Sequence, residues 1–257
     1  MPPPTPPGAA GASPTAVEVA FVVRPPIFED AALGSLEELQ VAAEESQFYQ
    51  ITLRENAEQP VALPAGAVYG HRSGKGHALL CPERVERLVQ GALQGQSCAI
   101  IAYGATGAGK SFTMGLESGG GRGGSGGGGG CSPRSVAGYV ACRLFALARE
   151  QPGSLGSLTV EVAMAEVYSI GSHDRVKDLL RVDCPAVGRA GAPLMGLSWH
   201  AAPDAEAVQR YMLAGAVVRS TGVMVANSHS SRSHAICILR VRCAGCWLLW
   251  SAALAAV

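Results

Sequence analysis

The feature that most constrains the fold is a glycine-rich octapeptide, GATGAGKS, at Gly104 to Ser111. It follows a continuous apolar run, Cys98 to Tyr103, which has the length of a buried strand. Glycines let a backbone curl tightly enough to aim several N–H groups at one anion, which side chains would obstruct. The spacing GxxxxGK[ST], placed between a buried strand and a helix, is typical of a loop that holds nucleotide phosphates.

Each part of this octapeptide has an expected role. The side chain of Lys110 is expected to reach the β- and γ-phosphates, and the hydroxyl of Ser111 to ligate Mg²⁺. A helix that opens after Gly109 would add the partial positive charge of its N-terminus. The chain contains no Asn-Lys-x-Asp guanine motif, which favours ATP over GTP.

Patterns elsewhere predict an alternation of strands and helices. Apolar runs of strand length predict strands at 17–23, 98–103, 158–164 and 235–241. Helical spacing predicts helices from Pro82 to Gly95, at 134–149 and at 204–214, and a capping box predicts a short helix that opens at 35–38. This alternation predicts a layered α/β domain with a largely parallel sheet.

Three segments depart from this pattern. Residues 1–16 are proline-rich without a basic residue, which predicts a disordered leader and no export signal. The insertion at 117–132 contains a run with ten glycines, Gly119 to Gly130, and predicts a surface loop. Residues 244–257 form an apolar tail of unknown role, shorter than the roughly twenty residues that span a bilayer. The predicted domain therefore covers 17–243.

The net charge and the cysteine content indicate which partners the chain can bind and whether its thiols are reduced. Twenty basic and twenty acidic residues cancel, so the chain has no global field to gather nucleic acid. Eight cysteines in 257 residues lie far below the density of a disulfide scaffold. We therefore expect reduced thiols and no nucleic-acid partner.

A second polar cluster, NSHSSRSH, occupies Asn227 to His234, immediately before the last predicted strand. It combines four hydroxyls, two imidazoles and one guanidinium. Such a segment is either a solvated loop or a sensor of a bound anion, and its residues alone leave both open. As a sensor, its hydroxyls could hold Mg²⁺ and a water, and its arginine could lock a closed loop by pairing with a carboxylate.

Taken together, the tracts AYGATGAGKSFTMG (102–115) and NSHSSRSH (227–234) resemble the phosphate loop and first switch of the kinesin motor domain. Val23-Arg24-Pro25 is similar to the end of the family's first strand. The stretches 166–168 and 176–180 resemble its Glu-Ile-Tyr and Asp-Leu-Leu segments. The resemblance covers roughly residues 17–241. It implies a P-loop NTPase fold with three α/β/α layers.

The resemblance also implies a set of site residues and ligands. ATP and Mg²⁺ would be the cofactors, microtubules the partner, and the cytoplasmic microtubule cytoskeleton the location, with the oligomeric state open. Ser230, Ser231 and Arg232 would be catalytic, and Ser111 and Ser231 would contact Mg²⁺. The implied nucleotide-binding residues are Arg24, Pro25, Gly104, Ala105, Thr106, Gly107, Ala108, Gly109, Lys110, Ser111, Phe112 and Asn227.

Departures from the family pattern leave two functions open. Ala105 and Ala108 replace the usual Gln and Ser of the phosphate loop, and Val22 replaces an arginine. After His234 the family continues into a strand that ends in Asp-x-Ala-Gly, the second switch, which this chain lacks. That strand lies beside the phosphate-loop strand in the family, so we expect an incomplete sheet on the C-terminal side. The chain is then an ATP-driven microtubule motor, or a truncated or degenerate kinesin-like nucleotide-binding or interaction protein without motor activity.

Overall fold

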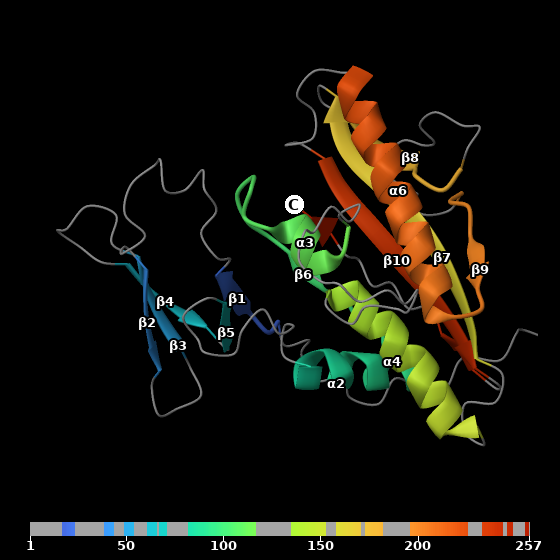
Figure 1. Cartoon of the computed structure of the whole chain (residues 1–257), viewed down its shortest axis with the longest axis horizontal. Coiled ribbons are helices and arrows are strands. Elements are labelled where there is room, and N and C mark those ends of the chain that lie inside the picture. Colours follow the sequence, from blue (N-terminus) through green and yellow to red (C-terminus); the bar gives the residue numbers. More distant parts are fainter. Residues whose placement is uncertain are drawn as a thin grey trace, which may run out of the picture. The chain divides into compact units, whose positions relative to one another are not determined.

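The computed structural model describes thirteen stretches of the chain, and the fold is reported for these. They are residues 17–23, 39–43, 49–53, 61–65, 67–70, 82–116, 135–152, 158–170, 173–181, 196–225, 233–243, 246–248 and 255–256. The chain divides into two compact units, Met1–Ala78 and Leu79–Val257. Figure 1 labels their helices and strands.

The first unit contains two small sheets. Strand β1 (Ala20–Val23) pairs in parallel with β5 (Ala67–Gly70), which confirms a strand within 17–23. Strands β2 (Leu39–Ala43), β3 (Tyr49–Leu53) and β4 (Val61–Ala65) form an antiparallel meander. The helix predicted to open at 35–38 begins outside the described residues, and it does not continue past them, because the next residues form β2. Pairing of Val41 with Ile51 outweighs a local capping signal, since propensity yields to strand pairing.

The second unit is built on a seven-stranded sheet. Its main path runs through β6 (Ile101–Ala102), β12 (Ala255–Ala256), β10 (Ser233–Cys243), β7 (Thr159–Ile170) and β8 (His173–Asp178). Strand β11 (Cys246–Leu248) pairs with β10, and β9 (His200–Ala202) pairs with β7.

The prediction of a largely parallel sheet is wrong for these described strands. Only β6 and β12 pair in parallel here, and β10 and β7 pair antiparallel over ten residues. For two other antiparallel pairs the reason is connection length: two residues, 171–172, separate β7 from β8, and two, 244–245, separate β10 from β11. Loops this short join only antiparallel neighbours.

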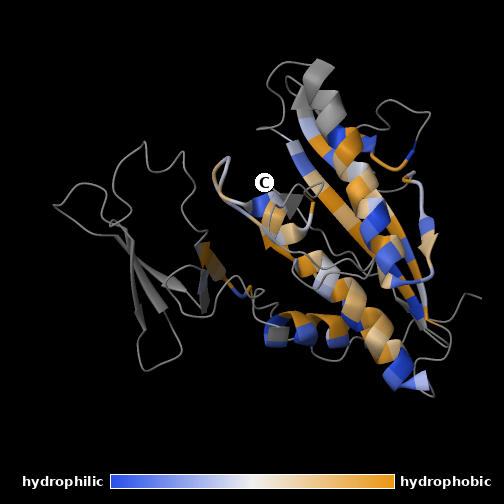
Figure 2. Cartoon of the chain, viewed as in Figure 1, coloured by the Kyte–Doolittle hydropathy of each residue, from blue (hydrophilic) through white to orange (hydrophobic). Residues whose placement is uncertain are grey.

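The described residues of this unit form four helices, and they confirm the helices predicted there. They are α2 (Pro82–Leu93), α3 (Lys110–Met114), α4 (Val136–Glu150) and α6 (Ala205–Val225). Helix α6 continues well past the predicted end at 214. Figure 2 shows apolar and polar residues alternating along α2. Within the described part of the chain, no helix combines the length and apolarity needed to cross a membrane.

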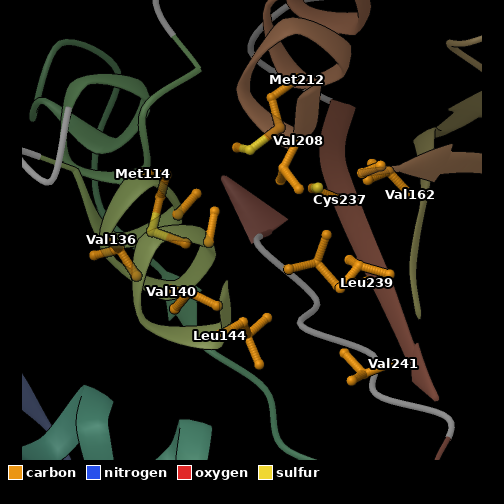
Figure 3. Packing of buried hydrophobic residues seen from close by; sticks show 14 of the residues in the cluster. Met114, Val136, Val140, Leu144, Val162, Val208, Met212, Cys237, Leu239 and Val241 are labelled. Carbon is orange, nitrogen blue, oxygen red and sulfur yellow. The ribbon is translucent and has the colours of Figure 1, made fainter. Parts of the chain in front are cut away.

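The helices pack against one face of the sheet. Alternate residues of β7 and β10, such as Val162, Cys237 and Leu239, lie in one buried cluster with the helices. Figure 3 shows these side chains directed toward Val140 and Leu144 of α4 and toward Val208 and Met212 of α6.

The opposite face of the sheet is covered differently. Ala163, Ala165 and Ile238 pack there with Leu197 and the partly buried Trp199. Among the described residues, the second helical layer of the predicted three-layer fold is therefore not found.

An ion pair joins α2 to α4. Arg143 donates from Nε to Glu86 Oε2 at 2.8 Å and from Nη2 to Glu86 Oε1 at 2.7 Å. Tyr139 also donates to Oε2, at 3.3 Å. The hydrogen bonds from Arg143 hold the pKa of Glu86 below its ordinary value. Because both side chains are mostly buried and the arginine is bidentate, the pair fixes how the two helices pack.

Replacing Glu86 with glutamine should lower the free energy of unfolding by about 1 kcal/mol at pH 7. A carboxyl whose folded pKa is lowered stabilises the fold above its unfolded pKa, near 4.5, and this contribution is lost as pH falls through the folded pKa. The difference in the free energy of unfolding between wild type and Glu86→Gln should therefore become smaller below that pH. Urea unfolding at pH 7 and at acid pH measures it. Glu206→Gln, which breaks an exposed pair with Arg210, is the control and should have little effect; equal losses would contradict the account.

The cysteines correct one expectation. Cys142 is disulfide-bonded, so the prediction of reduced thiols is wrong for this residue. Cys98 and Cys237 are free. Cys237 is fully buried in the core, and burial raises the pKa of its thiol to about 12.

Cys237 should therefore resist alkylation in the native state. At pH 8 a thiol with this pKa is almost entirely protonated, and only the thiolate is nucleophilic. Iodoacetamide labelling followed by peptide mass spectrometry should modify Cys98 first and Cys237 only after unfolding in urea. Equal native labelling of the two thiols would show that Cys237 is not in the core.

Candidate phosphate-binding site

The loop at 104–109 connects β6 to α3 as the motif predicts. Gly107 and Gly109 have φ values of 82° and 87°, a left-handed conformation that glycine adopts without steric cost. The N–H of Ala108 donates to the carbonyl of Ala105 at 3.1 Å, which closes a tight turn. Gly109 is the N-cap of α3. The glycines therefore stand where the backbone requires them.

Lys110, the first residue of α3, turns back over this loop. Its Nζ donates to the carbonyl oxygen of Gly104 at 2.6 Å and to that of Ala105 at 2.9 Å. Both acceptors are neutral carbonyls, so these bonds orient the ammonium without neutralising it. The positive charge is therefore held at the start of the loop.

The arrangement fits a phosphate group. Ala105, Thr106 and Gly107 are exposed, and a Cβ built on Gly107 would meet no atom within 4 Å. A ligand could therefore approach the loop backbone at this point. A preformed loop with an ammonium beside it suits an anion. Ser111, the second residue of α3, is half-buried next to the loop.

The short helix α3 is anchored at its C-terminal end. Met114 is buried in the core, and Gly115 caps the helix with φ of 83°, its N–H donating to the carbonyl of Ser111 at 2.9 Å. Ser135 lies against Gly115 and caps α4 by accepting from the N–H of Gly138 at 3.1 Å. The phosphate loop is thus attached to the core through both helices.

Three large apolar side chains around the loop are exposed. They are Ile101, Tyr103 and Phe112, of which Tyr103 is 85% exposed. Phe112, predicted to contact nucleotide, lies on α3 with 60% exposure.

The structure describes part of the predicted site. Gly104 to Phe112 are brought together in the loop and α3. The other predicted site residues lie outside the described stretches: Arg24, Pro25, Asn227, Ser230, Ser231 and Arg232. Their roles, and the Mg²⁺ contact by Ser231, remain predictions.

Strand β12 lies beside the phosphate-loop strand. Ala255 and Ala256 pair in parallel with Ile101 and Ala102 of β6, and Ala256 pairs antiparallel with Ala235 of β10. This is where the resemblance predicts a missing strand, the one that ends in the second switch. The predicted gap is not found, because the apolar tail supplies a short strand there.

A buried polar cluster next to the start of β10 was missed by the sequence prediction. Ser233 Oγ donates to Glu166 Oε1 at 2.7 Å. Arg219, on α6, donates from Nη2 to the carbonyl of Ser233 at 3.0 Å and to its Oγ at 3.2 Å, and from Nε to Glu166 Oε1 at 3.4 Å. The three residues therefore join α6, β7 and β10.

Comparison with known sequences gives one family. The kinesin motor domain family model matches residues 23–246. Kinesin-like protein KIFC2 of Mus musculus is 32% identical over 169 residues, which cover 63% of this chain and 19% of the relative. Kinesin-like protein KIF22 of Mus musculus is 27% identical over 245 residues, which cover 91% of this chain and 34% of the relative. The matches thus span about a fifth and a third of these relatives.

Comparison with solved structures agrees on the fold. The C-terminal motor domain of Kar3 from Candida glabrata aligns with a TM-score of 0.60 at 20% identity, covering 89% of this chain and 69% of that chain. The motor domain of the Kar3-like kinesin from Ashbya gossypii aligns with a TM-score of 0.60 at 16% identity, covering 91% and 67%. The sequence match over most of the chain and the shared fold lead to one assignment. The chain belongs to the kinesin motor domain family.

Proposed function

We propose that this chain binds ATP with Mg²⁺ at the 104–111 loop and hydrolyses it as part of a microtubule motor domain. The observation that carries the proposal is the position of Lys110, whose ammonium is held over a loop of exposed backbone by two carbonyl oxygens. A cation fixed beside such a loop suits the phosphates of a nucleotide. Membership of the kinesin motor domain family supports microtubules as the partner and a cytoplasmic, microtubule-associated location.

Each residue of the proposed site has a separate role in binding or hydrolysis. The backbone of Gly104 to Gly109 cradles the phosphates, Lys110 balances their charge, and Ser111 contacts Mg²⁺. Bound ATP supplies the phosphoanhydride bond, and Mg²⁺ supplies charge stabilisation at its phosphates. Ser230 and Ser231 hold Mg²⁺ or the attacking water, and Arg232 closes the switch by an ion pair.

The remaining site residues orient the nucleotide. Asn227 orders the switch over it, Arg24 and Pro25 pack against the adenine, and Phe112 contacts the nucleotide. The roles given to these residues are the ones that the resemblance to the kinesin motor domain implies for the motifs that contain them.

Titration of the chain with a fluorescent ATP analogue in Mg²⁺ tests the binding step. We expect saturable binding that ATP displaces more effectively than GTP, and loss of affinity when EDTA removes Mg²⁺. Phosphate release measured with and without microtubules tests the motor step, and stimulation by microtubules is the expected result. Absence of saturable binding would overturn the whole proposal.

A second function, nucleotide binding without motor activity, is favoured by one observation. Strand β12 pairs with β6 through Ala255 and Ala256 and with β10 through Ala256, at the place where the family resemblance puts the strand of the second switch. The printed sequence contains no Asp-x-Ala-Gly segment. Saturable ATP binding without microtubule-stimulated phosphate release would select this function over the first.

A further inference from the structure

The cluster of Arg219, Glu166 and Ser233 lies at one boundary of the proposed switch. Ser233 is the first residue of β10 and the seventh of the eight-residue NSHSSRSH motif. It follows directly on Arg232, to which the proposed function gives the closing ion pair. The contacts that hold Ser233 in place therefore also set the position at which the NSHSSRSH motif joins the sheet.

The cluster is largely shielded from water. Ser233 has 6% exposure, and the side chains of Arg219 and Glu166 have 18% and 12%. Buried polar groups are costly unless they are paired, so a buried network has few alternative arrangements. Here Glu166 Oε1 accepts from both Arg219 Nε and Ser233 Oγ, which closes the three residues into a ring of hydrogen bonds.

The geometry uses the forked shape of arginine. Its Nη2 donates to the carbonyl oxygen and the hydroxyl of Ser233, while its Nε reaches the carboxylate of Glu166. A lysine carries one donor atom and cannot reproduce this planar fork. Arg219 lies on α6 and Ser233 on β10, so the side chain connects the two elements that bound residues 226–232 in the sequence.

We propose that Arg219 is a positioning residue: through Ser233 and Glu166 it fixes the start of β10 and so sets the geometry for nucleotide hydrolysis. It contacts neither the 104–111 loop nor Lys110 in the structure's hydrogen bonds, so its effect falls on turnover and not on nucleotide affinity. This inference rests on the proposed ATPase function for its kinetic consequence. Its structural consequence, an ordered start of β10, stands independently.

Arg240 provides a matched control. It pairs with Glu161 on the same two strands, β10 and β7, with Nε to Oε2 at 2.6 Å. This pair lies on the opposite face of the sheet, where the guanidinium also lies 4.2 Å from the ring centre of Trp199. Arg240→Gln therefore removes an arginine–glutamate pair from the same strands without touching the start of β10.

The test compares amide hydrogen exchange and kinetics in full-length wild type, Arg219→Gln, Arg219→Lys and Arg240→Gln. In Arg219→Gln, exchange in peptides that contain the first residues of β10 should rise about tenfold, and phosphate release at saturating ATP should fall about tenfold, the scale of a lost charged hydrogen bond. Affinity for the ATP analogue should stay within about threefold. Arg219→Lys should change exchange and phosphate release in the same direction. It replaces Arg219→Gln in the comparison if the glutamine variant does not fold. Arg240→Gln should leave these peptides unchanged.

The outcomes separate this inference from the proposed function. If wild type does not bind ATP, the proposed function fails, and the exchange comparison alone decides whether Arg219 orders β10. If wild type binds and hydrolyses ATP but both Arg219 variants match wild type in exchange and turnover, the positioning role is overturned. Equal exchange at the start of β10 in Arg219→Gln and Arg240→Gln would also overturn it.

Discussion

Replacing Lys110 with alanine should lower the affinity for Mg·ATP by about 100-fold, because the variant loses a charged hydrogen-bond donor to the phosphates. The structure holds this ammonium against the carbonyls of Gly104 and Ala105, so its charge is already positioned before ligand arrives. Pre-positioning reduces the ordering cost of binding. Titration with a fluorescent ATP analogue measures the change in the dissociation constant.

Two variants separate charge from geometry in this experiment. Lys110→Arg keeps the charge but replaces a point donor with a bulky fork, and it should retain only part of the affinity. Lys177→Ala removes a lysine on β8, a strand that the sheet order separates from β6, and it should bind as wild type does. Unchanged affinity in Lys110→Ala would show that the phosphates bind elsewhere.

The second large effect is expected at Gly115, where alanine should lower the free energy of unfolding by about 2–3 kcal/mol. Two costs combine. The backbone has φ of 83°, which an L side chain adopts only with strain. The new Cβ would also meet the Cβ of Ser135 at 2.8 Å and approach its Oγ, which displaces the cap of α4.

Gly107 offers a control in which only the first cost arises. Its φ is 82°, and a Cβ there would meet nothing within 4 Å. Gly107→Ala should therefore lower stability by only about 1 kcal/mol, the backbone cost alone. Urea unfolding measures both variants. Adding Ser135→Gly to Gly115→Ala should recover part of the loss, since glycine is tolerated at an N-cap and leaves room for the new methyl group. Equal losses at the two glycines would show that Ser135 does not crowd Gly115.

The sequence predicted the elements whose signals are local. Helix α2 begins at Pro82 as expected, because proline suits the first helical turn and the apolar stripe through Val85 and Val89 faces the core. The phosphate loop was predicted because its glycines are required by the backbone conformation of a single turn. These features need no information from distant parts of the chain.

Strand direction was not predicted correctly, although one signal was available. Gly171-Ser172 stands between two strands, and glycine followed by serine is a common two-residue hairpin turn. That signal would have predicted β7 and β8 as antiparallel. The pairing of Ala255 and Ala256 with β6 has no local signal at all, since it joins residues more than 150 positions apart.

The cluster around Arg219 was missed because the predicted helix ended at 214. With α6 extended to Val225, the buried residues Val208, Met212 and Gly215 form one stripe, and helical spacing places Arg219 next on it. A charged residue on a core-facing stripe needs a partner. Glu166, in phase with the buried Val162 and Met164 of β7, supplies it.

Hydrogen exchange across the phosphate loop, with and without saturating Mg·ATP, tests the central claim most directly. If the loop holds the phosphates, peptides that cover 104–116 should exchange more slowly with Mg·ATP, since their amides then donate to the ligand. Peptides from α2 should not change. Bound nucleotide without protection of 104–116, or no bound nucleotide at all, would contradict the account.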